Sequence, residues 1–123
     1  MHGIRKVELV MRIISQSGLL DAPYELIAIS PYSGNMATIV GTFPGNDPAK
    51  GDRVYILGEY STEEKAMKAM EMCREQYAQC EINKHLIQKA ADNLEGVSIT
   101  FTGEVRNQLA DKYLFQFPAD DEI

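Results

Sequence analysis

The sequence predicts an α+β fold in which an antiparallel β-meander sheet packs against two helices and is followed by two further C-terminal strands. Three observations predict it. The first half has short β-type segments separated by turn residues, the middle has apolar residues at helical spacing, and the end has two more β-type segments. A chain of 123 residues has the usual size of one domain, and we expect a single domain over residues 11–118.

Four segments of the first half have the composition of strands. Turns are expected at Ser17-Gly18, at Asp21-Ala22-Pro23 and at PYSGN (31–35), and a loop at PGNDPAKGD (44–52). The predicted strands between them are residues 12–15, 25–30, 36–43 and 53–60. A meander of this kind leaves one face to be covered.

The next segment predicts an amphipathic helix over residues 61–80. Ser61 and Glu64 have the spacing of a capping box, which satisfies backbone N–H groups at a helix start. A second apolar pattern, from Ile82 to Leu94, ends at Gly96, a residue type common at helix C-termini. We therefore expect two helices, although the spacing also allows one bent helix. The apolar stripe of the first consists of Ala66, Ala69, Met70, Cys73, Tyr77 and Cys80.

The end of the chain predicts strands at residues 97–102 and 113–117, joined by GEVRNQLADK (103–112). Pro118 ends the second strand, and residues 119–123 (ADDEI) are expected to form a solvated acidic tail. Residues 1–10 are expected to be an N-terminal extension, because Met11 offers a second start.

The charge and the cysteines restrict the class of protein. The net charge is −6, and residues 61–123 hold seven basic and twelve acidic side chains, so DNA, RNA and anionic membranes should be repelled. No apolar run reaches the roughly 20 residues of a membrane helix, and no secretory signal is recognisable. Cys73 and Cys80 are too far apart on one helix to pair, which suits a reducing cytoplasm. We expect a cytoplasmic protein.

No motif indicates a reaction. Lys50 precedes Gly51, so the stretch does not match a phosphate-binding loop. The possible metal ligands are His2, Cys73, Cys80 and His85, whose spacing favours a buried thiol and a surface histidine instead. Cys80 and His85 are five residues apart, which does not bring two side chains together on a helix. We therefore expect no enzyme, no metal and no cofactor.

Two features favour a binding function. Arg106 and Asn107 offer a guanidinium beside an amide, which suits an anion and a base edge, although a solvated loop arginine is also consistent with the sequence. On the first helix, Met67 and Met72 lie away from the apolar stripe, and Arg74 borders it next to Tyr77. Exposed methionines and Arg–Tyr pairs are typical of interfaces. We therefore expect a homodimer or higher homo-oligomer through the 61–80 helix.

Three blocks give the chain a resemblance to small phage and prophage proteins of anaerobic Gram-positive bacteria. They are MRIISQSG with DAPYE (11–25), YSTEEKAMKAMEMCREQY (60–77) and YLFQFPADDEI (113–123). Among such proteins, the size and the strand-then-helix layout are similar to the Thoeris anti-defence sponges. This resemblance implies an oligomer that binds a cyclic ADP-ribose signal, or cyclic oligonucleotides of CBASS defence, without turnover.

The leading hypothesis is sequestration of a cyclic nucleotide immune signal in the host cytoplasm. Arg106 would contact phosphate and Asn107 a base or ribose edge. The further ligand-binding candidates are Arg74 with Tyr77, then Arg53 and, in reserve, Arg12. The alternative is an acidic phage protein that inhibits a host defence nuclease by direct binding, which the excess of carboxylates favours. A replication or structural accessory factor is a third hypothesis.

Overall fold

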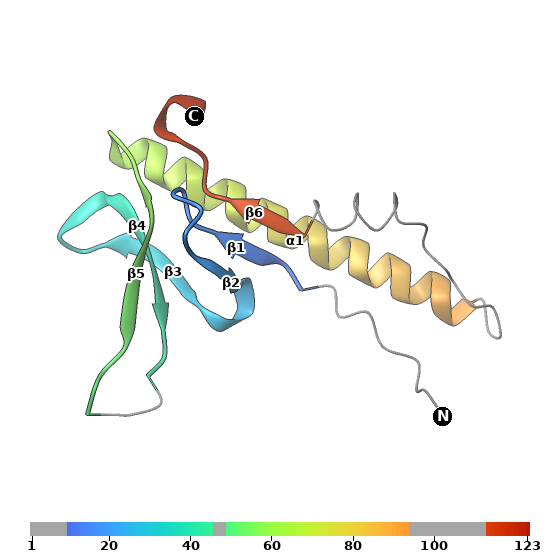
Figure 1. Ribbon diagram of the computed structural model, residues 1–123. Helices are drawn as coiled ribbons and strands as arrows, with labels where there is room; N and C mark the ends of the chain where they lie inside the picture. The colour runs from blue at the N-terminus through green and yellow to red at the C-terminus, as the bar shows by residue number, and fades with distance from the viewer. Residues whose placement is uncertain (1–9, 46–48, 94–112) are drawn as a thin grey trace.

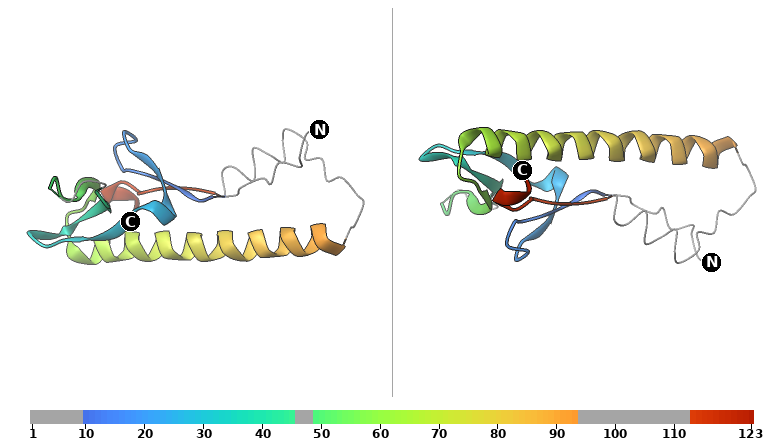
Figure 2. Two further views of the ribbon diagram at one scale, coloured as in Figure 1. Left: turned by 90° about the horizontal axis from the view of Figure 1, so that it is seen from below. Right: turned by 90° about the horizontal axis from the view of Figure 1, so that it is seen from above.

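Two three-stranded β-sheets and one long α-helix make up the structure, so the α+β class is confirmed (Figure 1). The computed structural model describes residues 10–45, 49–93 and 113–123. The helix runs along one side of the molecule, and the strands lie beside its N-terminal half (Figure 2). Within these described ranges, no helix is both long enough and apolar enough to cross a bilayer.

The antiparallel sheet is formed by consecutive strands, as expected for a meander. Its order is β3-β4-β5, with bounds Ala28–Tyr32, Asn35–Phe43 and Arg53–Glu59. The central strand β4 pairs antiparallel with both neighbours. Ile39 and Leu57 are fully buried in one cluster with helix residues. Gly41 allows Leu57 to lie over β4, because a Cβ there would be 3.1 Å from a Leu57 methyl carbon.

A second, mixed sheet replaces the first part of the predicted meander. Its order is β2-β1-β6, with bounds Asp21–Pro23, Arg12–Ile14 and Leu114–Gln116. The strand β1 pairs antiparallel with β2 and parallel with β6. The prediction of one sheet that includes residues 12–15 is therefore wrong, as is the prediction of a turn at residues 21–23. The proline at the end of β2 is tolerated because, among the described residues, β2 is an edge strand.

A short 3-10 helix, η1 (Tyr24–Leu26), occupies the start of the segment predicted as the strand 25–30. Pro23 precedes it with φ −63°, and the backbone N–H of Tyr24 donates to the carbonyl oxygen of Met11 at 2.9 Å. The chain then enters β3, two residues later. This turn connects the two sheets and brings Tyr24 against the helix, where it contacts Tyr77.

One continuous helix, α1 (Glu63–Asn93), covers 31 residues, so the prediction of two helices is wrong. Neither glycine nor proline occurs within these bounds, and residues 81–84 have no other feature that would stop a helix. The break in the apolar pattern near residue 81 therefore does not end the helix, and beyond it Ile82 and Leu86 are exposed. The predicted apolar stripe is confirmed, with Tyr77 half-buried and the other five residues buried.

The start of α1 lies slightly later than predicted. The hydroxyl of Thr62 accepts a hydrogen bond from the backbone N–H of Lys65 at 3.1 Å, which is the N-cap interaction. The predicted capping box of Ser61 and Glu64 is wrong by one position. The backbone N–H of Ser61 instead donates to a carboxylate oxygen of Asp120 at 2.7 Å.

Both sheets and α1 share one hydrophobic core. Ile13 of β1 and Phe117 just after β6 are almost fully buried, as are Ile39 and Leu57 of the other sheet. Tyr113 is buried beside them, and its hydroxyl donates to the carbonyl oxygen of Cys80 at 3.2 Å. This bond ties the start of the C-terminal segment to the middle of α1.

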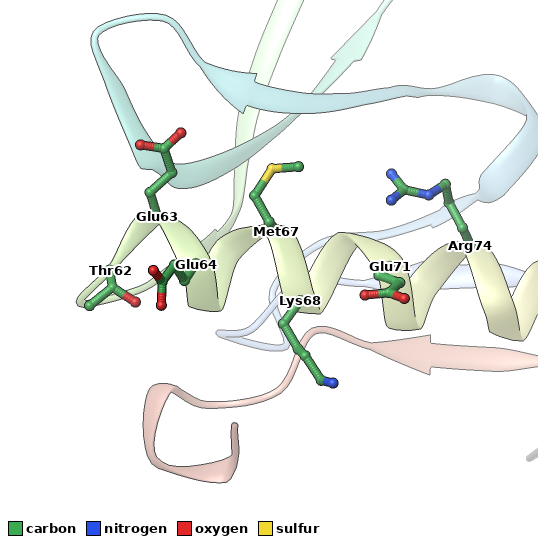
Figure 3. Close-up of a pocket in the computed structure, with 7 residues that line it drawn as sticks. All are labelled: Thr62, Glu63, Glu64, Met67, Lys68, Glu71 and Arg74. Carbon is green, nitrogen blue, oxygen red and sulfur yellow. The ribbon is translucent and has the colours of Figure 1, made fainter.

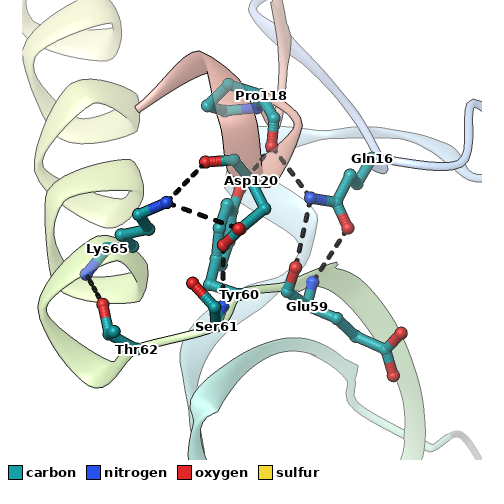
Figure 4. A network of polar contacts seen from close by, with 8 residues as sticks. All are labelled: Gln16, Glu59, Tyr60, Ser61, Thr62, Lys65, Pro118 and Asp120. Carbon is teal, nitrogen blue, oxygen red and sulfur yellow. Dashed lines mark hydrogen bonds and ion pairs between the residues drawn. The ribbon is translucent and has the colours of Figure 1, made fainter.

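A polar network joins the two sheets, the C-terminal segment and the start of α1 (Figure 4). The side chain of Gln16 bonds both the backbone N–H and the backbone carbonyl of Glu59, at 3.0 and 3.3 Å. Its amide also donates to the carbonyl oxygen of Pro118 at 3.0 Å, which the Tyr60 hydroxyl reaches at 2.8 Å. Lys65 donates to the carbonyl oxygen of Asp120 at 2.9 Å. The network fixes where β5 turns into α1.

The end of the chain is bound to the fold through this network. Residues 120–122 form a second 3-10 helix, η2 (Asp120–Glu122), and the expectation of a solvated tail is wrong for Asp120. Asp121 and Glu122 remain exposed. The predicted strand 97–102, the cap at Gly96, the connection 103–112 and residues 1–9 of the predicted extension lie outside the described residues.

Candidate functional site

A recess of about 280 Å³ lies between α1 and the segment that connects the two sheets. Its apolar part comes from Ile27, Ile29 and the buried helix residues Met70 and Cys73, and its polar groups come from η1 and α1. Burial raises the pKa of the Cys73 thiol to about 12, so this wall stays neutral at physiological pH. The lining residues are Tyr24, Glu25, Ile27, Ile29, Met70, Cys73 and Arg74.

An aromatic pair borders this recess. The rings of Tyr24 and Tyr77 are stacked, with centroids 4.1 Å apart and planes at 24°. The hydroxyl of Tyr77 donates to Glu25 at 2.8 Å, and this hydrogen bond to a carboxylate raises the pKa of Tyr77 to about 12. Tyr24 belongs to η1 and Tyr77 to α1. The hydrogen bond from Tyr77 to Glu25 therefore holds the two rings in place relative to each other.

The recess carries one positive and one negative side chain. Arg74 and Glu25 both line it, and neither forms one of the two salt bridges found among the described residues. Burial raises the pKa of Tyr24, and the charge of Arg74 partly opposes this rise. Arg74, Glu25 and Tyr24 thus place a guanidinium, a carboxylate and a phenol side chain around one small recess. It is not a purely anion-attracting site.

A shallow groove of about 810 Å³ runs along the outer face of α1 (Figure 3). Arg74 borders both this groove and the recess. In Figure 3, Glu63, Met67 and Arg74 point to one side of the helix, and Lys68 points to the other. Every lining residue comes from α1 or its N-cap, and they are Thr62, Glu63, Glu64, Met67, Lys68, Glu71 and Arg74.

The sequence-predicted site residues are partly brought together. Arg74 lines the recess with Tyr24, and Tyr77 does not line it but stacks on the Tyr24 ring. Arg53 is exposed at the first position of β5, at the end of that strand away from α1 (Figure 1). Arg12 donates from Nε to Asp21 at 2.7 Å and does not line the recess. Arg106 and Asn107 lie outside the described residues.

Tyr24 and Glu25 were missed from the sequence because residues 25–30 were interpreted as a strand. The signal was the PYE triplet, in which a proline sets the backbone for a turn that presents the next two side chains together.

The described part of the chain has no group of three or more His, Cys, Asp or Glu side chains that could hold a metal ion. No protein-family model, no curated protein and no solved structure matches the chain. The site is therefore interpreted from its own geometry.

Proposed function

We propose that the protein is a phage anti-defence protein that binds and sequesters a cyclic nucleotide immune signal without cleaving it. The observation that carries this proposal is the recess that Arg74 lines together with Tyr24, whose ring stacks on that of Tyr77. A guanidinium binds phosphate with charge-assisted hydrogen bonds. An aromatic face beside it suits a nucleobase.

The size of the recess supports binding of part of such a ligand. Small-molecule sites commonly enclose about 300–1,000 Å³, and the recess of about 280 Å³ lies just below that range. One nucleoside phosphate unit fits this space better than a whole cyclic dinucleotide. The rest of the ligand would extend out of the recess, where a second subunit could contact it.

Glu25 gives the proposed site its selectivity. A carboxylate repels a bare phosphate, so inorganic phosphate should bind poorly despite Arg74. A nucleotide differs because it presents hydrogen-bond donors, such as ribose hydroxyls or an exocyclic amine, on the side away from its phosphate. In the proposed pose Glu25 accepts from such a donor while Arg74 contacts the phosphate. The hydrogen bond from Tyr77 holds Glu25 in position for this role.

The test is the identity of any nucleotide that the protein retains. The protein is expressed in cells with an active Thoeris or CBASS system, purified, and heated, and the released small molecules are analysed by mass spectrometry. Sequestration predicts an intact cyclic nucleotide in the supernatant. Release of a linear or hydrolysed nucleotide would contradict the proposal, and so would protein that contains no nucleotide under these conditions.

A second candidate function is inhibition of a host defence nuclease by direct protein binding. The observation that favours it is the exposed apolar pair Val54 and Ile56 on β5, which are 55% and 56% exposed. Within the described residues β5 is an edge strand, and such edges commonly accept a strand from a partner protein. For this candidate, the Ile56→Lys variant should lose inhibition of the purified nuclease. An unchanged inhibition constant would exclude β5 as the interface.

A further inference from the structure

The recess between η1 and α1 has two opposite charges around one small space. Glu25 belongs to η1 and Arg74 to α1, and both line the recess. Both side chains are exposed, and neither takes part in the ion pairs found in the described parts of the chain, so they do not pair with each other. A ligand that carries both charges therefore meets a partner for each of them. An anion or a cation alone also meets a charge of its own sign.

The neighbouring side chains show how these two charges are placed. The Tyr77 hydroxyl donates to one oxygen of Glu25 at 2.8 Å, and no contact found among the described residues uses the second oxygen. Burial raises the pKa values of Tyr24 and Cys73, and the positive charge of Arg74 partly opposes both rises. The guanidinium therefore lies near both of these lining residues. A carboxylate only accepts and a guanidinium only donates, so the ligand must offer a donor and an acceptor.

The rest of the lining restricts the size and the apolar part of such a ligand. Ile27, Ile29 and Met70 supply aliphatic side chains without charge. The volume of about 280 Å³ lies just below the range of about 300–1,000 Å³ that is common for small-molecule sites, so a ligand of few atoms fits best. The recess therefore suits a small zwitterion with an aliphatic group.

We propose that the recess binds a free α-amino acid with an aliphatic side chain, such as leucine. The carboxylate of the amino acid accepts from Arg74, and its ammonium donates to the second oxygen of Glu25. Its side chain lies against Ile29 and Met70. This ligand goes beyond the proposed nucleotide function and does not rest on it. A bound amino acid would compete with a nucleotide for Arg74.

Titration of the isotope-labelled full chain with L-leucine, followed by NMR chemical shifts, measures the affinity. Two analogues each remove one charge of the ligand, since isocaproate lacks the ammonium and isoamylamine lacks the carboxylate. Each should bind at least about tenfold more weakly than leucine, because one charge-assisted hydrogen bond is lost and one repulsion remains. This comparison uses only the unaltered protein, so it does not depend on how a variant folds.

Two substitutions remove the matching charges of the protein. Arg74→Gln should weaken leucine binding by about tenfold and should bind isoamylamine at least as tightly as the unaltered protein does. Glu25→Gln should weaken leucine binding by a similar factor and should bind isocaproate at least as tightly, because the repulsion is removed. It also keeps an oxygen for Tyr77. The control is Glu63→Gln, outside the recess, which should bind leucine within about twofold of the unaltered protein.

Three results would overturn the amino acid site. They are the absence of shifts with leucine at millimolar concentrations, equal affinities for leucine and both analogues, and equal weakening by Arg74→Gln and Glu63→Gln. The nucleotide proposal fails or stands separately. Leucine binding to a protein that binds no cyclic nucleotide supports the amino acid site and contradicts the nucleotide proposal. Nucleotide binding without leucine binding contradicts the amino acid site alone.

Discussion

Gln16 donates a hydrogen bond from its side-chain amide to the carbonyl oxygen of Pro118, at 3.0 Å and across 102 positions of the sequence. The same side chain bonds the backbone of Glu59 on both its N–H and its carbonyl oxygen (Figure 4). One residue therefore connects the loop after β1, the end of β5 and the C-terminal segment. We infer that Gln16 determines how the two sheets are joined.

Replacing Gln16 by alanine should lower the free energy of unfolding by about 2 kcal/mol, because three hydrogen bonds to backbone groups are lost. Urea unfolding at neutral pH measures this change. The matched control is Gln79→Ala, since Gln79 is exposed and bonds only the nearby side chain of Asn83 among the contacts identified. Its change should remain below about 0.5 kcal/mol. Equal losses for the two variants would contradict the role assigned to Gln16.

The hydroxyl of Tyr60 should make stability depend on alkaline pH. Burial, with smaller contributions from Asp120 and Glu122, raises the pKa of Tyr60 to about 12, above its ordinary value of 10.0. Because the folded pKa is the higher one, its contribution is complete below pH 10 and is lost as the pH rises towards 12. Tyr60→Phe should cost about 1 kcal/mol at neutral pH, through the lost bond to Pro118.

Unfolding measured at pH 9 and at pH 11 tests the pH dependence. The loss of stability between the two should be smaller in Tyr60→Phe than in the unaltered protein. Tyr32→Phe serves as the control because Tyr32 is exposed. If Tyr60→Phe and the unaltered protein lose the same free energy over this range, the Tyr60 hydroxyl is not protected by the fold.

Asp120 should contribute stability that disappears in acid. The hydrogen bond from the Ser61 N–H, aided by Lys65, lowers the pKa of Asp120 from its ordinary value of 3.8. A lowered folded pKa means that the contribution is present above pH 3.8 and is lost as the pH falls through the folded value. Asp120→Asn keeps an oxygen for Ser61 but removes the charge.

Acid unfolding, monitored by circular dichroism, tests whether Asp120 contributes this stability. The Asp120→Asn variant should be less stable at pH 6 and should show a shallower loss of stability below pH 4. Asp121→Asn, at an exposed neighbouring carboxylate, should follow the unaltered protein. A steep acid transition that persists in Asp120→Asn would show that other carboxylates dominate.

Local patterns predicted the elements that depend on local physics. The stripe from Ala66 to Cys80 is buried as expected because helical periodicity alone decides which side chains face one way. The strands β4 and β5 could also be predicted, because their composition and the turn residues beside them are local features of the sequence. The length of α1 was missed because a change in the apolar pattern was taken as a boundary, although nothing in residues 63–93 breaks a helix.

Pairing between distant segments could not be predicted in the same way. The parallel pairing of Ile13 with Phe115 depends on the whole chain being folded, and no spacing between them indicates it. The recess likewise depends on contacts between segments that are distant in the sequence. Arg74 was identified from its place on the helix, but Glu25 became a candidate only when η1 was seen to turn it towards α1.

Three blocks of the sequence, residues 11–25, 60–77 and 113–123, meet in space. Gln16, Tyr60 and Asp120 come from different blocks and lie in one network (Figure 4). Tyr24 and Arg74 come from two of the blocks and line one recess. Contacts between these distant blocks therefore form part of the joint between the sheets and part of the recess.

Calorimetric titration with glycocyclic ADP-ribose and with cyclic di- and trinucleotides tests the central claim most directly. We predict that the unaltered protein binds at least one of them and that Arg74→Gln weakens this binding by about thirtyfold, through loss of a charge-assisted hydrogen bond. Arg53→Gln, the same substitution at the far end of β5, should bind within about twofold of the unaltered protein. Absence of heat with every ligand, or equal weakening by both substitutions, would contradict binding in the Arg74 recess.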